Sequence, residues 1–232
     1  MARRGTWELA TEIVSYWSTT GKGRPLTVCI PGGTCSTAAL LDDALRGILL
    51  TTDDNNNSSS MDIRVVVIPC VGGEKYAQRQ MISLRRNTGG MEHNNNSNEA
   101  DGSLLLNMSI PTVLPPAPDV TRYFGQASLP DDAQYFRFGE PNERILETFR
   151  EMKNSYGVTL DLLYGAPSWT ILFRHFRTEP NDNSGFDPKA PLAGREIMYV
   201  HSGGLEGINS QLMRYKYKGL IDIEEVQLPG RQ

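Results

Sequence analysis

The order of apolar and polar residues in the first part of the chain predicts a helix followed by two strand–turn–helix units. Apolar side chains recur at helical spacing over residues 6–17, which predicts an amphipathic helix with one face on a core. Short apolar runs at 26–30 and 63–68 predict buried strands, and a turn containing Gly-Gly follows each of them. Helical spacing returns after each turn, over residues 36–50 and 74–86.

The same alternation continues in the second part of the chain. The pattern predicts helices over 141–156, 168–177 and 205–217 and strands over 158–163 and 197–200. Strands that alternate with helices indicate the α/β class, with a parallel twisted sheet that helices cover on both faces. We expect residues 1–220 to form a single domain and residues 221–232 to form a C-terminal tail.

Two polar tracts, residues 51–60 and 87–103, interrupt this pattern. Both are rich in Asn and Ser, and both contain too few apolar side chains to bury a core face. Their composition predicts solvated, disordered insertions between structural elements.

Composition and charge argue against several classes of protein. The 232-residue chain has 27 acidic and 23 basic residues and a net charge of −4, which argues against a dedicated nucleic-acid binder. No apolar run approaches the roughly 20 residues of a membrane span, and the first residues lack the apolar core of a secretory signal. Three cysteines without CxxC spacing and three scattered histidines predict neither a disulfide framework nor a metal site. We therefore expect a cytoplasmic protein that binds neither membranes nor metal ions.

The turn after the first predicted strand, PGGTCSTA at residues 31–38, is the strongest candidate site. In a parallel sheet such turns share one edge, where ligands bind. The glycines leave the backbone accessible, and Thr34, Ser36 and Thr37 offer hydroxyl groups at a helix start, which suits a phosphate. The turn lacks the lysine of a P-loop and the GxGxxG spacing of a dinucleotide site. Local spacing alone leaves an ordinary helix N-cap equally open.

The segment PGGTCSTAALL resembles the loop that holds the phosphate of pyridoxal 5′-phosphate in fold-type II, or tryptophan synthase β-like, enzymes. Within that group it is most similar to the 1-aminocyclopropane-1-carboxylate deaminase and D-cysteine desulfhydrase family. Three further segments agree in order, namely FGEPNE at 138–143, DLLYG at 161–165 and YVHSGG at 199–204. The resemblance, over about residues 6–217, implies the large-domain portion of such an enzyme, with pyridoxal 5′-phosphate as cofactor and a small amino acid as substrate.

The resemblance also implies which residues bind the cofactor phosphate. Gly33, Thr34, Ser36 and Thr37 would hold it through backbone N–H groups and hydroxyls. Cys35 belongs to the same cofactor-binding loop and stands where the family usually has glycine, which could narrow the cradle.

Further along the chain, the resemblance assigns a catalytic role to Tyr164, which matches the family's active-site tyrosine and would assist proton transfer. The spacing around Tyr164 alone would favour a partly buried core tyrosine over a catalytic one. Ser202 would reach the pyridine nitrogen of the cofactor. Two positions depart from the family: Gly165 replaces a side chain that often faces that nitrogen, and Phe138 replaces a tyrosine of the deaminases.

The Schiff-base lysine of the family has no counterpart among the matching segments. In the family it lies in an N-terminal segment, so the resemblance predicts an N-terminally truncated member that lacks a group on which catalysis depends. Lys75 is the lysine nearest to the expected site, but an exposed lysine at a helix start is usually only solvated.

Three interpretations follow. The chain is an incomplete pyridoxal-phosphate-dependent lyase or deaminase, for which the resemblance implies a homodimer; or a non-catalytic homologue that binds phosphate or cofactor weakly or associates with partner subunits; or an unrelated α/β domain. The first two require Thr34, Tyr164 and Ser202 to lie together in space.

Overall fold

The computed structural model describes residues 2–53, 61–88, 110–114, 136–177 and 192–226. Its four strands are all parallel and form one sheet in the order β3-β2-β1-β4. The strands are β1 (Leu26–Gly32), β2 (Ile63–Pro69), β3 (Thr112–Val113) and β4 (Glu196–Tyr199). The α/β class and the parallel sheet that the sequence predicts are therefore confirmed.

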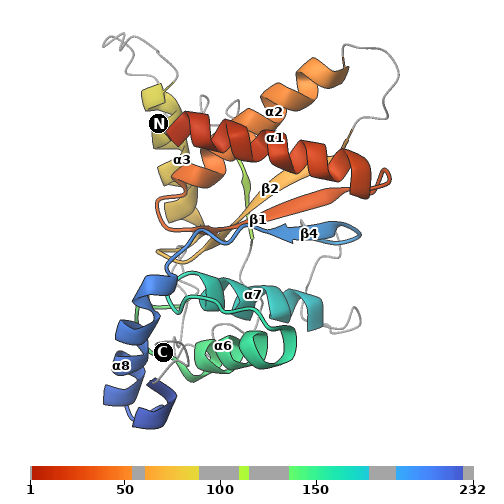
Figure 1. The fold of residues 1–232 in the computed structure, drawn as a ribbon. Helices are drawn as coiled ribbons and strands as arrows, with labels where there is room; N and C mark the ends of the chain where they lie inside the picture. Colours follow the sequence, from red (N-terminus) through yellow and green to blue (C-terminus); the bar gives the residue numbers. More distant parts are fainter. Residues whose placement is uncertain (1, 54–60, 89–109, 115–135, 178–191, 227–232) are drawn as a thin grey trace, which may run out of the picture.

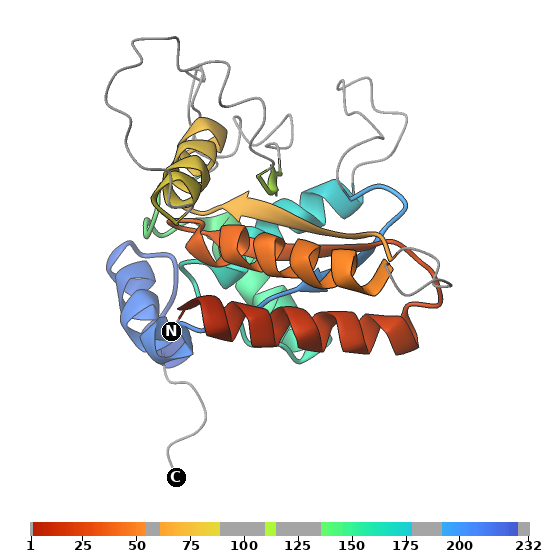
Figure 2. The same ribbon diagram turned by 90° about the horizontal axis from the view of Figure 1, so that it is seen from above.

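Helices cover both faces of this sheet (Figure 1). On one side lie α1 (Ala2–Thr20), α2 (Ser36–Asp53) and α3 (Glu74–Thr88), and α1 and α2 run side by side across that face (Figure 2). On the other side lie α6 (Glu143–Tyr156), α7 (Gly165–Arg177) and α8 (Ile208–Tyr217). Short 3₁₀ turns, η1 (Leu205–Gly207) and η2 (Ile223–Val226), flank α8.

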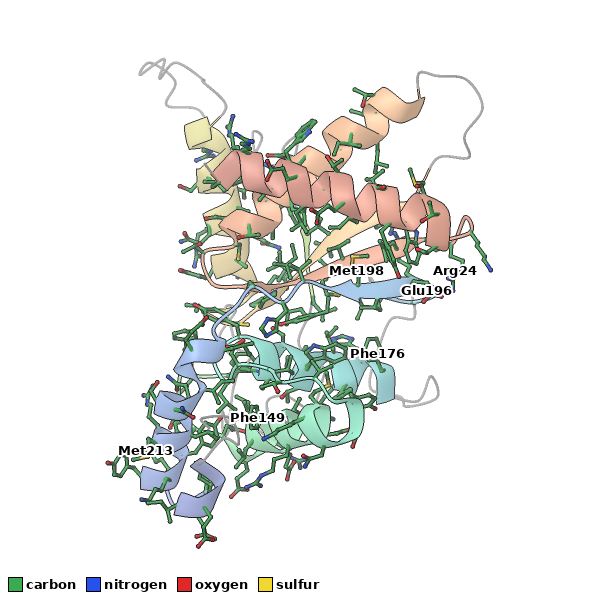
Figure 3. All side chains as sticks on the ribbon, viewed as in Figure 1. Arg24, Phe149, Phe176, Glu196, Met198 and Met213 are labelled. Atoms are coloured by element: carbon green, nitrogen blue, oxygen red, sulfur yellow. The ribbon has the colours of Figure 1, made fainter. Side chains whose placement is uncertain are left out.

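The apolar runs of the strands are continuous because both faces of the sheet are buried. Along β2, Val65 and Val67 belong to the core shared with α1, α2 and α3, whereas Val66 and Ile68 belong to the core shared with α6, α7 and α8. Figure 3 shows these two layers of side chains on either side of the sheet, with Phe149 of α6 in the second layer. Each fully buried side chain of this size contributes roughly 1.5–3 kcal/mol.

The strand predicted over residues 158–163 is wrong. This segment forms an extended stretch and a turn, and no strand of the described sheet pairs with it. Its apolar residues Leu160 and Leu162 are buried in the core of α6 and α7, which explains their alternation with polar positions. Because the carboxylate of Asp161 accepts hydrogen bonds from the following backbone N–H groups, local bonds replace the ladder that a strand would need.

Local capping explains where the neighbouring helices begin and end. The side chain of Asn142 accepts a hydrogen bond from the N–H of Arg144 at 2.9 Å, so α6 begins at Glu143, two residues later than predicted. The helix ends at Tyr156 and is capped by Gly157, whose φ of 68° places it in the left-handed region that favours glycine. In contrast, α7 begins at Gly165, earlier than the predicted residue 168.

The first residues of both polar tracts are helical, whereas the sequence predicted loops there. Residues 51–53 continue α2 and residues 87–88 continue α3, while residues 54–60 and 89–103 lie outside the described part of the chain. Of the expected C-terminal tail, residues 223–226 form η2 and residues 227–232 lie outside. Strand β3 was not predicted, because two residues are too short for a periodic signal. None of the described helices is long and apolar enough to cross a membrane.

Candidate functional site

A cavity of about 280 Å³ lies where the strand order of the sheet reverses direction. From β1 the chain proceeds to β2 and β3 on one side, and β4 pairs with the opposite edge of β1. In open α/β sheets this reversal separates the turns that follow the two strands and creates a binding crevice at their carboxyl ends. The cavity is lined by three separate segments, which are Pro31, Gly33, Thr34, Cys35, Ser36, Thr37 and Ala38; Tyr164; and Ser202, Gly203 and Gly204.

The first segment connects β1 to α2 and places hydroxyl groups at a helix N-terminus. Strand β1 ends at Gly32 and α2 begins at Ser36, so Gly33, Thr34 and Cys35 form the turn. The Oγ atoms of Thr34 and Ser36 lie 3.0 Å apart and share a hydrogen bond. The first turn of this 18-residue helix contains no acidic residue, so its partial positive charge faces no carboxylate of its own turn. The segment could therefore hold an anionic group.

Cys35 adopts a backbone conformation that non-glycine residues rarely occupy. Its φ is 59°, in the left-handed region, which is consistent with glycine being the usual residue in the resembling family. Its side chain is almost completely buried, and burial raises the pKa of the thiol to about 11. The Cys35 thiol is consequently neutral near pH 7 and is no activated nucleophile.

The second segment carries Tyr164, and the buried carboxylate of Asp161 holds its backbone. Asp161 is 3% exposed. The backbone N–H groups of Leu163, Tyr164 and Gly165 donate to its two carboxylate oxygens, at distances of 2.9, 2.6 and 2.8 Å. The N–H of Ala166 donates to the backbone carbonyl of Asp161 at 2.8 Å. One residue thus satisfies the N–H groups around the start of α7.

The Tyr164 phenol lies against the first segment and against an aromatic neighbour. A Cβ added to Gly33 would stand 3.3 Å from the phenol oxygen of Tyr164. The rings of Phe138 and Tyr164 have centroids 5.3 Å apart and are tilted by 53°. Burial raises the pKa of Tyr164 above its usual value, and the negative charge of Asp161 acts in the same direction. The phenol is therefore protonated at neutral pH and can donate a hydrogen bond.

The third segment follows β4 and contains two glycines with positive φ. Gly203 and Gly204 have φ values of 100° and 93°. Ser202 lines the cavity and is exposed to solvent. A Cβ added to Gly204 would lie 3.2 Å from the Cβ and Cγ atoms of Asp161, whereas one added to Gly203 would meet no atom within 4 Å. Because Gly204 has no side chain, the third segment can lie against Asp161, the residue that holds the backbone of the second segment.

All seven residues that the sequence predicts for the site line this one cavity. Two of the glycine-containing turns that follow predicted strands, at residues 31–33 and 202–204, contribute to it together with Tyr164, whereas the turn at residues 71–73 does not. No lysine is among the described residues that line it, and Lys75 lies on the exposed side of the start of α3. The cavity brings the residues together; their roles in binding and catalysis stay predictions.

Sequence reasoning missed the part that Asp161 plays in the site. An aspartate four residues before a glycine that starts a helix is a capping signal that could have indicated the hydrogen bonds to residues 163–165. The contact between Asp161 and Gly204 joins segments far apart in the sequence, so no local signal could have indicated it.

Gly165 also has a structural explanation. A Cβ at this position would lie 2.8 Å from the Oδ2 atom of Asp161 and 3.1 Å from the Cβ atom of Leu160. The side chain that family members often carry here would collide with the carboxylate that caps α7.

Within the part of the chain that the structure describes, there is no candidate metal site and no ionised thiol. No three His, Cys, Asp or Glu side chains of the described residues lie close enough to hold a metal ion, and His93 lies outside those residues. Cys29, Cys35 and Cys70 are free and buried. Burial raises the pKa of Cys29 and of Cys70 to about 12, so these thiols are neutral as well.

Comparison with known proteins shows a similarity of fold. No protein-family model and no curated protein sequence matches this chain. Its structure is similar to the crystal structure of an ACC deaminase homologue, with a TM-score of 0.50 and 15% sequence identity. The similarity covers 91% of this chain and 50% of the other, so this chain spans about half the length of that protein. At such low identity the similarity establishes the fold alone.

Proposed function

We propose that this chain forms the cofactor-binding part of a pyridoxal 5′-phosphate-dependent lyase or deaminase that acts on small amino acids. The observation that carries the proposal is the convergence of Thr34, Tyr164 and Ser202, from three distant segments, on one cavity at the reversal point of the sheet. The similarity in fold to an ACC deaminase homologue supports the same enzyme class. The activity of the whole enzyme is part of the proposal, because the similarity covers half of that protein.

The residues and the size of the cavity fit this cofactor. Small-molecule sites have volumes of roughly 300–1,000 Å³, so a cavity of about 280 Å³ suits a single phosphorylated ring better than a dinucleotide. Gly33 is needed at its position because a Cβ there would press on the Tyr164 phenol. The donor set consists of hydroxyls and a helix N-terminus, which match the phosphate of the cofactor.

In this proposal the chain would hold both the phosphate and the ring of the cofactor in this cavity. Thr34, Ser36 and Thr37 would hold the phosphate through hydroxyl and N–H groups, aided by the positive end of α2. The Ser202 hydroxyl would serve as a partner for the ring nitrogen. When bound, pyridoxal 5′-phosphate supplies an electron sink that stabilises negative charge at the α-carbon of an amino acid.

Tyr164 contributes a proton in this proposal. Because its pKa is raised, chiefly by burial, the phenol holds its proton at neutral pH and donates it when a substrate atom gains charge. Phe138 packs on the Tyr164 ring and restricts its orientation, but it carries no hydroxyl group. This apolar contact favours a small amino acid other than the cyclopropane substrate, for which the deaminases use a second tyrosine.

Binding measurements with and without the phosphate group test the proposal. We expect pyridoxal 5′-phosphate to bind at least about 100-fold more tightly than pyridoxal, because several charge-assisted hydrogen bonds would be lost with the phosphate. Replacement of Thr34 and Ser36 by alanine should remove most of this difference. Ser210→Ala is the matched control, because Ser210 is also near a helix start but lies outside the cavity. Equal affinities for the two ligands would refute the proposal.

A second candidate is a homologue that binds the cofactor or phosphate without catalysis. The absence of lysine among the described residues that line the cavity favours it. Borohydride reduction in the presence of pyridoxal 5′-phosphate, followed by peptide mapping, distinguishes the two. A pyridoxyl group on one lysine supports the enzyme, whereas tight binding without such labelling supports the non-catalytic homologue.

A further inference from the structure

We infer that Asp161 is a positioning residue that fixes the Tyr164 wall of the cavity against the Ser202–Gly204 wall. The inference rests on the proposed function, because it assigns these walls to the ring end of a bound cofactor. Asp161 does not line the cavity; it lies behind two segments that do. Its side chain accepts hydrogen bonds from the Tyr164 segment and lies next to Gly204 of the third segment.

The hydrogen bonds of Asp161 define the position of Tyr164. Its Oδ1 atom accepts from the backbone N–H of Tyr164 at 2.6 Å and from that of Leu163 at 2.9 Å. Its Oδ2 atom accepts from Gly165 at 2.8 Å. Three bonds to consecutive N–H groups leave the backbone at Tyr164 little freedom to rotate, so the direction of the phenol depends on this carboxylate.

Two glycines provide the space that the carboxylate occupies. A Cβ at Gly165 would stand 2.8 Å from Oδ2, and a Cβ at Gly204 would stand 3.2 Å from the Cβ and Cγ atoms of Asp161. The carboxylate is thus enclosed between the start of α7 and the turn after β4. A side chain at either glycine would therefore press on the Asp161 side chain, so both positions depend on the absence of a Cβ atom.

Asp161 also affects the chemistry of the groups around it. Its negative charge helps to raise the pKa of Tyr164, although burial is the larger cause. The same charge acts in the same direction on Cys70 and Tyr199, again after burial. A buried anion surrounded by groups that keep their protons favours a protonated Tyr164, which is the form that donates hydrogen bonds.

Two probes that occupy different parts of the cavity test this inference. Inorganic phosphate requires only the first segment, whereas pyridoxamine 5′-phosphate also reaches Tyr164 and Ser202 and cannot react with lysines. We expect Asp161→Asn to lower the affinity for pyridoxamine 5′-phosphate about tenfold, and Asp161→Ala to lower it further. The affinity of either variant for phosphate should stay within about twofold of the unaltered chain.

A pair of glycine variants separates the contact with Asp161 from backbone strain. Gly204→Ala would press on Asp161, whereas Gly194→Ala also places alanine at a positive φ, of 67°, but meets no neighbour within 4 Å and lies outside the cavity. We expect Gly204→Ala to weaken binding of pyridoxamine 5′-phosphate about tenfold more than Gly194→Ala does. This comparison holds even if Asp161→Ala fails to fold.

A capping control and the unaltered chain complete the experiment. Asn142→Ala removes the cap of α6, outside the cavity, and should change neither affinity. If the unaltered chain does not prefer pyridoxamine 5′-phosphate to phosphate, the proposed function fails. If it does, but Asp161→Asn and Gly204→Ala bind both probes normally, the proposed function stands and the role of Asp161 is refuted.

Discussion

The phenol oxygen of Tyr164 faces Gly33 so closely that a Cβ at residue 33 would stand 3.3 Å from it. This contact joins the turn between β1 and α2 to the start of α7, and α2 and α7 lie on opposite faces of the sheet (Figure 1). The cavity therefore depends on a glycine in the first segment as much as on the hydroxyl groups beside it.

Gly33→Ala tests this dependence. The partly exposed Tyr164 can move by a few tenths of an ångström, so we expect the free energy of unfolding to change by less than about 1 kcal/mol. The affinity for pyridoxamine 5′-phosphate should fall about tenfold, because the added methyl group displaces the phenol and obstructs the backbone N–H groups. Urea denaturation and calorimetric titration measure the two effects. A large loss of stability with unchanged affinity would contradict this explanation.

The left-handed conformation of Cys35 makes glycine the better small residue at this position. Both Cys35→Gly and Cys35→Ala remove the sulfur atom, but only alanine is strained at a φ of 59°. We expect the glycine variant to be more stable than the alanine variant by about 1 kcal/mol in urea denaturation. The opposite order is expected at Ala44, buried within α2, where glycine should be less stable by about 1 kcal/mol or more. Equal stability at residue 35 would show that its backbone relaxes.

The three buried thiols predict a loss of stability at alkaline pH. Burial raises the pKa of Cys35 to about 11 and that of Cys29 and Cys70 to about 12, whereas thiols in the unfolded chain ionise near pH 8.5–9. The native state therefore retains protons that the unfolded state releases. Stability is fully present below about pH 8.5 and falls above it, by about 1.4 kcal/mol per pH unit for each thiol until its native pKa is reached.

Denaturation at pH 7 to 10 measures this effect, and Cys29→Ala should reduce the slope by the contribution of one thiol. The alanine variant is less stable at pH 7, so the slopes and not the midpoints are compared. An aromatic disulfide reagent at pH 8 should label the native chain very slowly and the unfolded chain at three cysteines. Rapid labelling of the native protein would show that the thiols are accessible.

Elements with a long apolar pattern, and strands that are buried on both faces, could be predicted from the sequence. Elements that depend on tertiary contacts could not. Strands β1 and β2 bury both faces, so their apolar runs were unmistakable. The apolar positions Leu160 and Leu162 gave the same signal but pack in an irregular segment. Whether such a run becomes a strand depends on a neighbouring strand, which local sequence does not specify.

Part of the candidate site could also be predicted from local sequence, and part of it could not. Thr34 and Ser36 form a local signal, because hydroxyls after a glycine turn favour a helix start. Tyr164 and Ser202 have no such signal, and only resemblance to a family linked them to the first segment. The enclosure of Asp161 by Gly165 and Gly204 depends on the packing of α7 against the turn after β4, so it follows from the fold and not from spacing.

At the amino-terminal ends of the strands, opposite the cavity, Arg195 connects the starts of β1, β2 and β4. Its position depends on the ion pair with Asp62. Its side chain is 6% exposed, donates to the carbonyl oxygens of Leu26 and Asp62 and to the hydroxyl of Thr27, and pairs with the Asp62 carboxylate. The hydrogen bond from Arg195 is the largest cause of the lowered pKa of Asp62. Folding thus favours the charged carboxylate.

Asp62→Asn should therefore destabilise the protein mainly above acidic pH. The contribution of Asp62 is present above its unfolded pKa, near 3.9, and disappears as the pH falls through the lower native value. We expect a loss of about 1–2 kcal/mol at pH 7, less than for a fully buried pair because Asp62 is 46% exposed. Arg64→Gln is the control: Arg64 also pairs with Asp62 but is 59% exposed, so its replacement should cost less than about 0.5 kcal/mol. Equal losses for the two variants at pH 7, or a loss for Asp62→Asn that does not diminish as the pH falls into the acidic range, would show that burial of Arg195 does not set the strength of this pair.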